Sequence, residues 1–90
     1  LKKGQWFIHI GYNGRTYIKV TSTEIMETKG IIEIEQYFIG SYAGSNYRYF
    51  EYKDREQIGT SVLLGSFYSK YDYPEQMFQQ IQDWLNKQKK

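Results

Sequence analysis

The dipeptide Asn13-Gly14 constrains this chain more than any other short segment, because it lies between two runs of alternating apolar residues. The alternation runs from Trp6 to Ile10 on one side and resumes from Ile18 to Val20 on the other. Asn-Gly accepts the positive φ angles of the tight turn that joins adjacent antiparallel strands. The segment QWFIHIGYNGRTYIKV therefore predicts a β-hairpin.

Further strand patterns follow the hairpin. Residues 31–40 alternate apolar and polar side chains, and residues 47–54 alternate aromatic rings with charges. After a turn expected at residues 57–60, residues 61–71 form another strand pattern, which Gly65 interrupts as a bulge would. These patterns predict a run of antiparallel strands.

Residues 21–30 fit two structures. Thr21 with Glu24 matches a helix capping box, and Gly30 could close a single helical turn. A short strand over residues 23–28 fits the β-rich neighbours better, so we expect the strand.

The C-terminal segment carries a helical pattern. Asp72 is a suitable N-cap with Glu75 three residues later, and Pro74 lies in the first turn, where its missing N–H costs no hydrogen bond. Apolar residues then recur at helical spacing: Met77, Phe78, Ile81, Trp84 and Leu85. We expect this stripe to cover one face of the sheet, with Trp84 as its largest buried ring.

Together these elements predict an α+β fold that is mostly β. Its core is an antiparallel meander of five to seven short strands, closed by one C-terminal amphipathic helix in a single domain, 1–90. This order of elements resembles that of the pleckstrin-homology-like barrel, and also that of the curved sheet plus helix of the Whirly single-strand binders. A curved sheet or a small barrel is therefore expected, with residues 1–4 and 87–90 as frayed basic ends.

The charge distribution argues against duplex DNA as a partner. The formal net charge is +2, from 12 basic and 10 acidic residues. Five of the basic residues lie at the two ends of the chain, namely Lys2, Lys3, Lys87, Lys89 and Lys90. The other 7 stand against the same 10 acidic residues, so the body of the chain carries a net charge of −3. Duplex DNA binders usually present a strong basic stripe.

The residue types needed for catalysis or metal binding are scarce. The chain has no cysteine and a single histidine, His9, which is too few soft ligands for a typical metal site. Glu33 and Glu35 alternate along a strand, as ordinary solvated carboxylates do. We therefore predict no enzymatic activity, no metal and no cofactor. No apolar run is long enough for a membrane span.

The segment SNYRYFEYKDR, residues 45–55, carries most of the functional information. On a strand, Tyr47, Tyr49 and Lys53 share one face, while Phe50 and Tyr52 share the other. An odd number of residues in the preceding loop would place Phe50 and Tyr52 in the core beside Ile34 and Phe38. An even number would invert that assignment.

Tyrosine, tryptophan and arginine are the residues enriched at binding hot spots, which favours a small non-enzymatic domain that binds a protein through a Tyr-rich sheet face. Self-association through a strand edge or sheet face is also compatible with the pattern. The alternative is single-stranded nucleic-acid binding, with rings stacking on bases and Arg and Lys contacting phosphates. Either partner would use the same residues: Tyr47, Tyr49, Lys53 and Arg55, then Tyr17 and Lys19.

Overall fold

The computed structural model describes residues 1–24, 29–41 and 48–88. The strands are β1 (Trp6–Ile10), β2 (Gly14–Ser22), β3 (Ile31–Ser41), β4 (Arg48–Gly59) and β5 (Ser69–Lys70). Helix α2 spans Thr60–Leu63 and helix α3 spans Pro74–Gln88.

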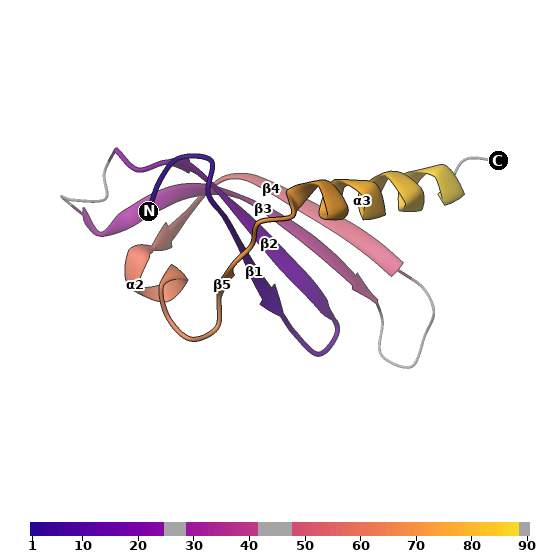
Figure 1. Ribbon diagram of the computed structural model, residues 1–90, viewed down its shortest axis with the longest axis horizontal. Helices are drawn as coiled ribbons and strands as arrows, with labels where there is room; N and C mark the ends of the chain where they lie inside the picture. The colour runs from indigo at the N-terminus through magenta and orange to yellow at the C-terminus, as the bar shows by residue number, and fades with distance from the viewer. Residues whose placement is uncertain (25–28, 42–47, 89–90) are drawn as a thin grey trace.

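The five strands form one antiparallel sheet in the order β4-β3-β2-β1-β5 (Figure 1). The predicted α+β fold, a mostly β meander closed by a C-terminal helix, is therefore confirmed. Of the two expected shapes, the open sheet forms and the barrel does not. The last strand, β5, has only two residues and pairs with β1, so β4 stays at the opposite margin of the sheet.

The hairpin β1–β2 forms as predicted, but its turn lies one residue earlier. The Gly11 N–H donates to the Gly14 carbonyl at 2.8 Å, so Tyr12 and Asn13 are the central residues. Neither Asn13 nor Gly14 has a positive φ. Gly14 is needed for another reason: a Cβ there would meet the Ile39 carbonyl and lie 2.6 Å from the Gly40 Cα. It allows β2 and β3 to approach closely.

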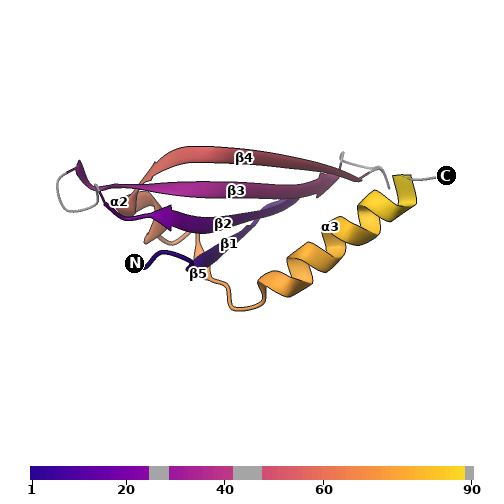
Figure 2. The same cartoon turned by 90° about the horizontal axis from the view of Figure 1, so that it is seen from above.

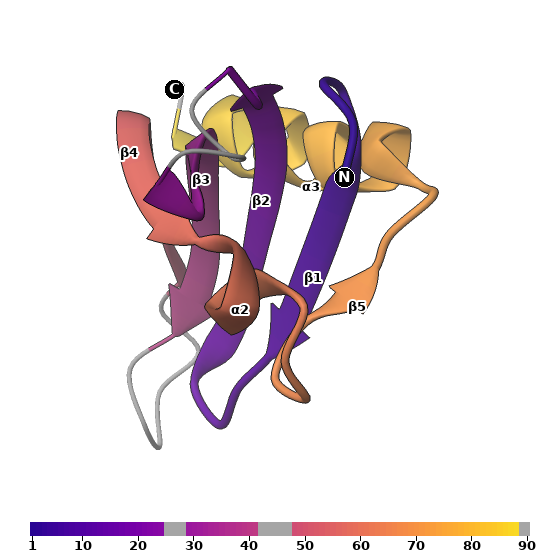
Figure 3. The same cartoon turned by 90° about the vertical axis from the view of Figure 1, so that its left-hand side faces the viewer.

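The sheet has two faces, and α3 lies on one of them, which we call the helix face (Figures 2 and 3). There Met77 of α3 is fully buried with Trp6 and Tyr17. Partly buried side chains surround these three: Ile8, Tyr37, Ile39, Tyr71 and Ile81. Aromatic rings thus fill the space between the helix and the strands.

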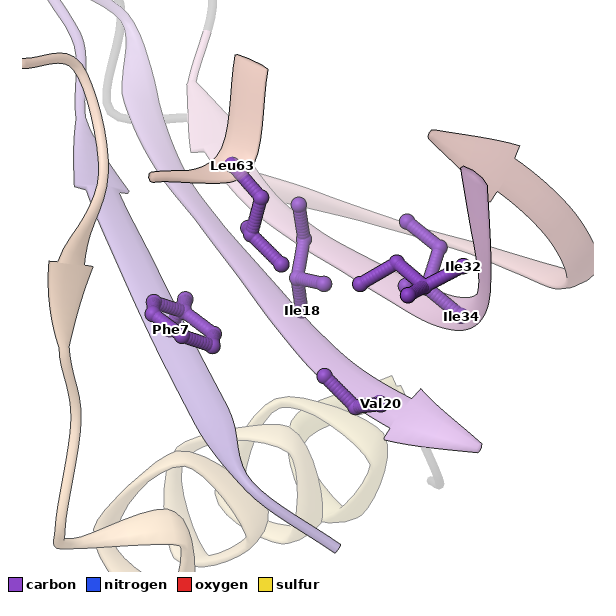
Figure 4. Packing of buried hydrophobic residues seen from close by; sticks show 6 residues of the cluster. All are labelled: Phe7, Ile18, Val20, Ile32, Ile34 and Leu63. Atoms are coloured by element: carbon purple, nitrogen blue, oxygen red, sulfur yellow. The ribbon is translucent and has the colours of Figure 1, made fainter. Parts of the chain in front are cut away.

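The other side of the sheet, the opposite face, holds an aliphatic cluster (Figure 4). Its buried members are Phe7, Ile18, Val20, Ile32, Ile34 and Leu63. Leu63 comes from α2, and it is the only buried residue of that helix. The fold therefore has a small core on each face of one sheet.

The prediction of a strand over residues 61–71 is wrong except for Ser69–Lys70. The expected turn at residues 57–60 is also displaced, because β4 continues to Gly59. The chain leaves β4 at one margin and must cross the opposite face to reach β5 at the other. Neighbouring strands lie about 4.8 Å apart, and three strands separate β4 from β5. The connecting segment must therefore run across the strands over this distance, and it cannot itself be a long strand within the sheet. The short helix α2 makes the crossing and inserts Leu63 into the cluster.

Helix α3 forms where the sequence predicts it, with two differences. Pro74 is its first residue, so Tyr73 rather than Asp72 directly precedes the helix. Trp84 is only partly buried, whereas Met77 is fully buried. The helix crosses the sheet obliquely, so the N-terminal end of its apolar stripe, at Met77, meets the core, and its C-terminal half reaches the margin (Figure 2).

Two smaller predictions concern the chain ends and residues 21–30. In the N-terminal segment, which was expected to fray, Leu1 packs against the aliphatic cluster, and the Gly4 N–H donates to the Val20 carbonyl at 2.8 Å. Strand β2 ends at Ser22, and Thr23 and Glu24 lie outside any strand. The rest of the strand expected over residues 23–28 lies outside the described residues.

Candidate functional site

Strand β4 forms one margin of the sheet along its whole length. It has 12 residues and pairs with β3 on its inner side. Within residues 1–24, 29–41 and 48–88, no strand pairs with its outer side. Every residue from 51 to 57 is exposed. An exposed strand edge of this length presents backbone N–H and C=O groups to any extended segment that can pair with it.

The register of β3 with β4 settles which side chains of β4 share a face. Ser41 is opposite Arg48, so the even number of residues 42–47 separates them. Tyr37 is opposite Tyr52 and Ile39 is opposite Phe50. Phe50 and Tyr52 therefore lie on the helix face, away from Ile34, and the even-loop alternative is the one that forms.

Tyr49 and Lys53, two of the predicted binding residues, lie on the opposite face. The Tyr49 ring is 5.5 Å from that of Phe38, and Lys53 is exposed opposite Gln36. The structure thus brings together Phe38, Tyr49 and Lys53 on the part of this face that the aliphatic cluster leaves open. Tyr47, predicted to join them, lies outside the described residues.

Arg55 occupies a β-bulge instead of a regular strand position. The pairing of β4 with β3 shifts between Ile34 and Gln36, where Arg55 adopts a φ of 56°. Its N–H donates to Asp54 Oδ1 at 2.8 Å, which supports this left-handed conformation. The bulge divides β4 into a regular segment up to Lys53 and a second segment from Glu56.

Tyr17 and Lys19 lie on the helix face and are therefore separated from Tyr49 and Lys53. The expectation that Tyr17 is exposed is wrong, because its ring is fully buried 5.2 Å from Tyr71. Its hydroxyl has no hydrogen-bond partner within the described part of the chain. Lys19 is partly exposed, with its Nζ 6.0 Å from the centroid of the Trp6 ring. Sequence alternation placed both residues on one face correctly but could not show that α3 covers that face.

An aromatic cluster that the sequence did not predict lies where α3 meets β4. Tyr37 is central to this cluster, with ring centroids at 4.9 Å from Tyr52 and 5.8 Å from Phe78. Phe50 contacts both Tyr37 and Trp84, at 6.3 and 6.5 Å. Tyr52 and Phe78 remain 47% and 46% exposed. Two large rings are thus half-exposed on the helix face, and one of them, Tyr52, lies on β4 at the margin of the sheet.

A hydrogen bond within this cluster changes the acidity of Tyr37. Its hydroxyl donates to Glu35 Oε2 at 2.8 Å. Burial and this bond to a carboxylate together raise the pKa of Tyr37 well above its usual value of about 10. Partial desolvation and the carboxylates of Glu35 and Asp54 also raise the pKa of Tyr52. Both phenols therefore act as neutral rings near neutral pH.

The raised pKa of Tyr37 makes the stability of the fold fall in alkaline solution. Below about pH 10 the phenol is neutral in the folded and unfolded chains, so its contribution is fully present. Above that pH the unfolded chain ionises while the folded chain keeps the proton, which favours unfolding. We expect Tyr37→Phe to flatten the decline, as measured by urea denaturation between about pH 8 and 11.5. Tyr12→Phe, at an almost fully exposed ring, is the control and should leave the slope unchanged. Equal slopes for the wild type and Tyr37→Phe would contradict this account.

Other titratable groups form no cluster with metal-binding geometry among the described residues. The His9 Nδ1 lies 2.8 Å from the Phe67 carbonyl oxygen, and its ring packs edge-on against Phe67 at 6.0 Å. One surface cavity of about 420 Å³ lies between the β1–β2 turn and α3, and Arg15 lines it. A second of about 510 Å³ is lined by Lys2, Lys3 and Lys70. Neither has a carboxylate or histidine among its described lining residues.

Comparison with known proteins provides no relative from which function could be transferred. No protein-family model, no curated protein and no solved structure matches this chain. None of the helices among the described residues has the length and apolar character needed to cross a membrane.

Proposed function

We propose that this chain is a small non-enzymatic binding domain that contacts a protein partner along β4. The observation that carries the proposal is the long outer edge of β4 with the half-exposed ring of Tyr52 on it. In this mode an extended segment of the partner adds to the sheet as a further strand. Main-chain hydrogen bonds would hold the segment, and the side chains on the two faces would select it.

The side chains of β4 suit a peptide segment. Tyr52 projects on the helix face, and Tyr49 and Lys53 project on the opposite face. Tyrosine at the centre of an interface combines a large apolar area with a polar group, and truncation of such a hot spot costs about 2 kcal/mol or more of binding free energy. Arg55, at the bulge, would mark the end of the paired segment.

Charge disfavours the nucleic-acid alternative. On the opposite face, the positions of Glu51 and Glu56 flank that of Lys53. A phosphate backbone laid along this strand would meet two carboxylates and one ammonium group, whereas a protein segment can match both signs. Phe38 and Tyr49 could stack on bases, but the two exposed rings of the α3–β4 cluster lie on the other face.

The test compares two variants that add the same charge at different surfaces. Tyr52→Glu places a carboxylate at the centre of the proposed contact, and Tyr12→Glu places one on the exposed β1–β2 turn. We expect the immobilised wild type and Tyr12→Glu to capture the same protein, and Tyr52→Glu to lose it while melting at a similar temperature. Retention of that protein by a folded Tyr52→Glu variant would refute the proposed contact.

A fluorescence titration separates the two partner classes. Tyrosine and tryptophan emission is followed while a mixed-sequence single-stranded oligonucleotide is added at several salt concentrations. A flat titration at low salt is the expected result. Saturating quenching that weakens steeply with salt would favour nucleic-acid binding instead.

A further inference from the structure

We propose that the segment which adds to β4 is β4 of a second copy of this chain, related by a twofold axis that passes through Tyr52. This inference rests on the proposed function, in which the outer edge of β4 is the contact strand. It identifies the partner, the register and the side chains that face one another.

Charge complementarity selects the register. In an antiparallel pair related by a twofold axis perpendicular to the sheet, one residue lies opposite itself, and its neighbours lie opposite each other. With Tyr52 on the axis, Glu51 of each copy lies opposite Lys53 of the other. Opposite charges directly across two strands stabilise the pair, and like charges destabilise it.

The neighbouring registers lack this complementarity. An axis through Glu51 places the carboxylate opposite itself, and an axis through Lys53 places the ammonium group opposite itself. An axis through Phe50 places Glu51 opposite the neutral Tyr49. An axis through Lys53 would also set Glu51 opposite Arg55, but Arg55 lies at the bulge. Among centres within the exposed part of the regular segment, only Tyr52 pairs opposite charges inside that segment. Both charged residues are exposed, so their side chains are free to meet those of a second copy.

The helix face supports the same axis. Tyr52 is 47% exposed, and its covered side contacts Tyr37 at 4.9 Å. Pairing through Tyr52 would bring two such rings together and join the aromatic clusters of both copies across the axis. Contact between Trp84 and Phe50 holds the C-terminal half of α3 near this margin, so each helix would flank the joined cluster (Figure 3).

The bulge at Asp54 and Arg55 limits the assembly. Regular geometry ends at Lys53, so the directly paired ladder is short, from Glu51 to Lys53 in each copy. The other margin of the sheet is β5, which has only two residues. Among the strands of the described residues, β4 alone offers a long free edge, and a twofold pair uses that edge in both copies, which disfavours growth into a filament. A short ladder implies a weak, reversible dimer.

Charge exchange tests this register. Sedimentation equilibrium of the wild type up to about 1 mM should show a monomer–dimer equilibrium. Glu51→Lys or Lys53→Glu alone turns both attractive contacts of the pair into repulsive ones, and each should weaken dimerisation about tenfold or more. The double variant with Glu51→Lys and Lys53→Glu restores opposite charges and should recover the dimer. Glu24→Lys, at an exposed site outside the strands, is the charge-matched control and should leave dimerisation unchanged.

A second measurement uses the absence of cysteine from the chain. Residues opposite each other across antiparallel strands have Cβ atoms within about 4.5–5.5 Å, close to disulfide distance. Mild oxidation of Tyr52→Cys at high concentration should therefore link two chains rapidly, and Tyr12→Cys should link them far more slowly.

The outcomes separate this inference from the proposed function. A wild type that stays monomeric at about 1 mM would overturn the proposed dimer. The proposed register is also overturned if the single charge changes leave dimerisation intact, or if the double variant fails to restore it. If such a chain still captures another protein through Tyr52, the function of β4 stands with a different partner. If the dimer forms with the stated charge dependence, the second copy is the partner.

Discussion

Trp6→Ala is expected to lower the free energy of unfolding by about 3–5 kcal/mol, among the largest effects of any single change in this chain. Trp6 is 9% exposed and lies between the sheet and α3, with ring centroids 5.6 Å from Tyr37 and 5.7 Å from Phe78. Its loss leaves a cavity beneath the helix and removes a ring that three neighbours contact. Domains of this size are stable by only about 5–13 kcal/mol, so the variant would lose from about a quarter to all of its stability.

Urea denaturation followed by circular dichroism measures this loss. Tyr12→Ala, at an almost fully exposed ring, should change the unfolding free energy by less than about 0.5 kcal/mol. A loss below about 1 kcal/mol for Trp6→Ala would mean that α3 does not depend on this ring, and the packing on the helix face would need revision.

Leu63→Ala is expected to cost about 2–5 kcal/mol, although Leu63 belongs to a helix of only four residues. Its side chain is fully buried in the aliphatic cluster with Ile18 and Ile32. Removing it opens a cavity in the core of the opposite face and releases the link between β4 and β5. The adjacent Leu64 is 62% exposed, which makes Leu64→Ala a control matched in chemistry and sequence position.

The two leucine variants should differ clearly in thermal and urea denaturation. Leu64→Ala should remain within about 0.5 kcal/mol of the wild type. Equal losses for both variants would show that α2 contributes through its helix and not through insertion of Leu63 into the core.

Strand alternation was sufficient to place some of the predicted binding residues, but not to predict whether the others are exposed. Tyr49 and Lys53 were predicted together and lie together, because strand alternation alone places them on one face. Tyr17 was predicted with them, but it is buried under α3 on the other face. Tyr52 and Phe78 were not predicted as binding residues, because their half-exposure depends on how far α3 and the strands cover each ring on the helix face.

Local patterns in the sequence determined the elements that depend on neighbouring residues alone. Alternation specified β1, β2 and β3, and apolar spacing together with Pro74 specified α3. These signals act over a few residues, so the antiparallel meander and the closing helix could be predicted without a structure.

Only the tertiary structure decided the features that depend on residues far apart in the chain. The crossing from β4 to β5 turned Val62, Leu63 and Leu64 from an expected strand into a helical turn with one buried side chain. The register of β3 with β4 assigned Phe50 and Tyr52 to the helix face, and docking of α3 then buried Tyr17. A period of two residues shows which side chains share a face, but burial is a property of the whole chain, because it depends on which distant element covers that face.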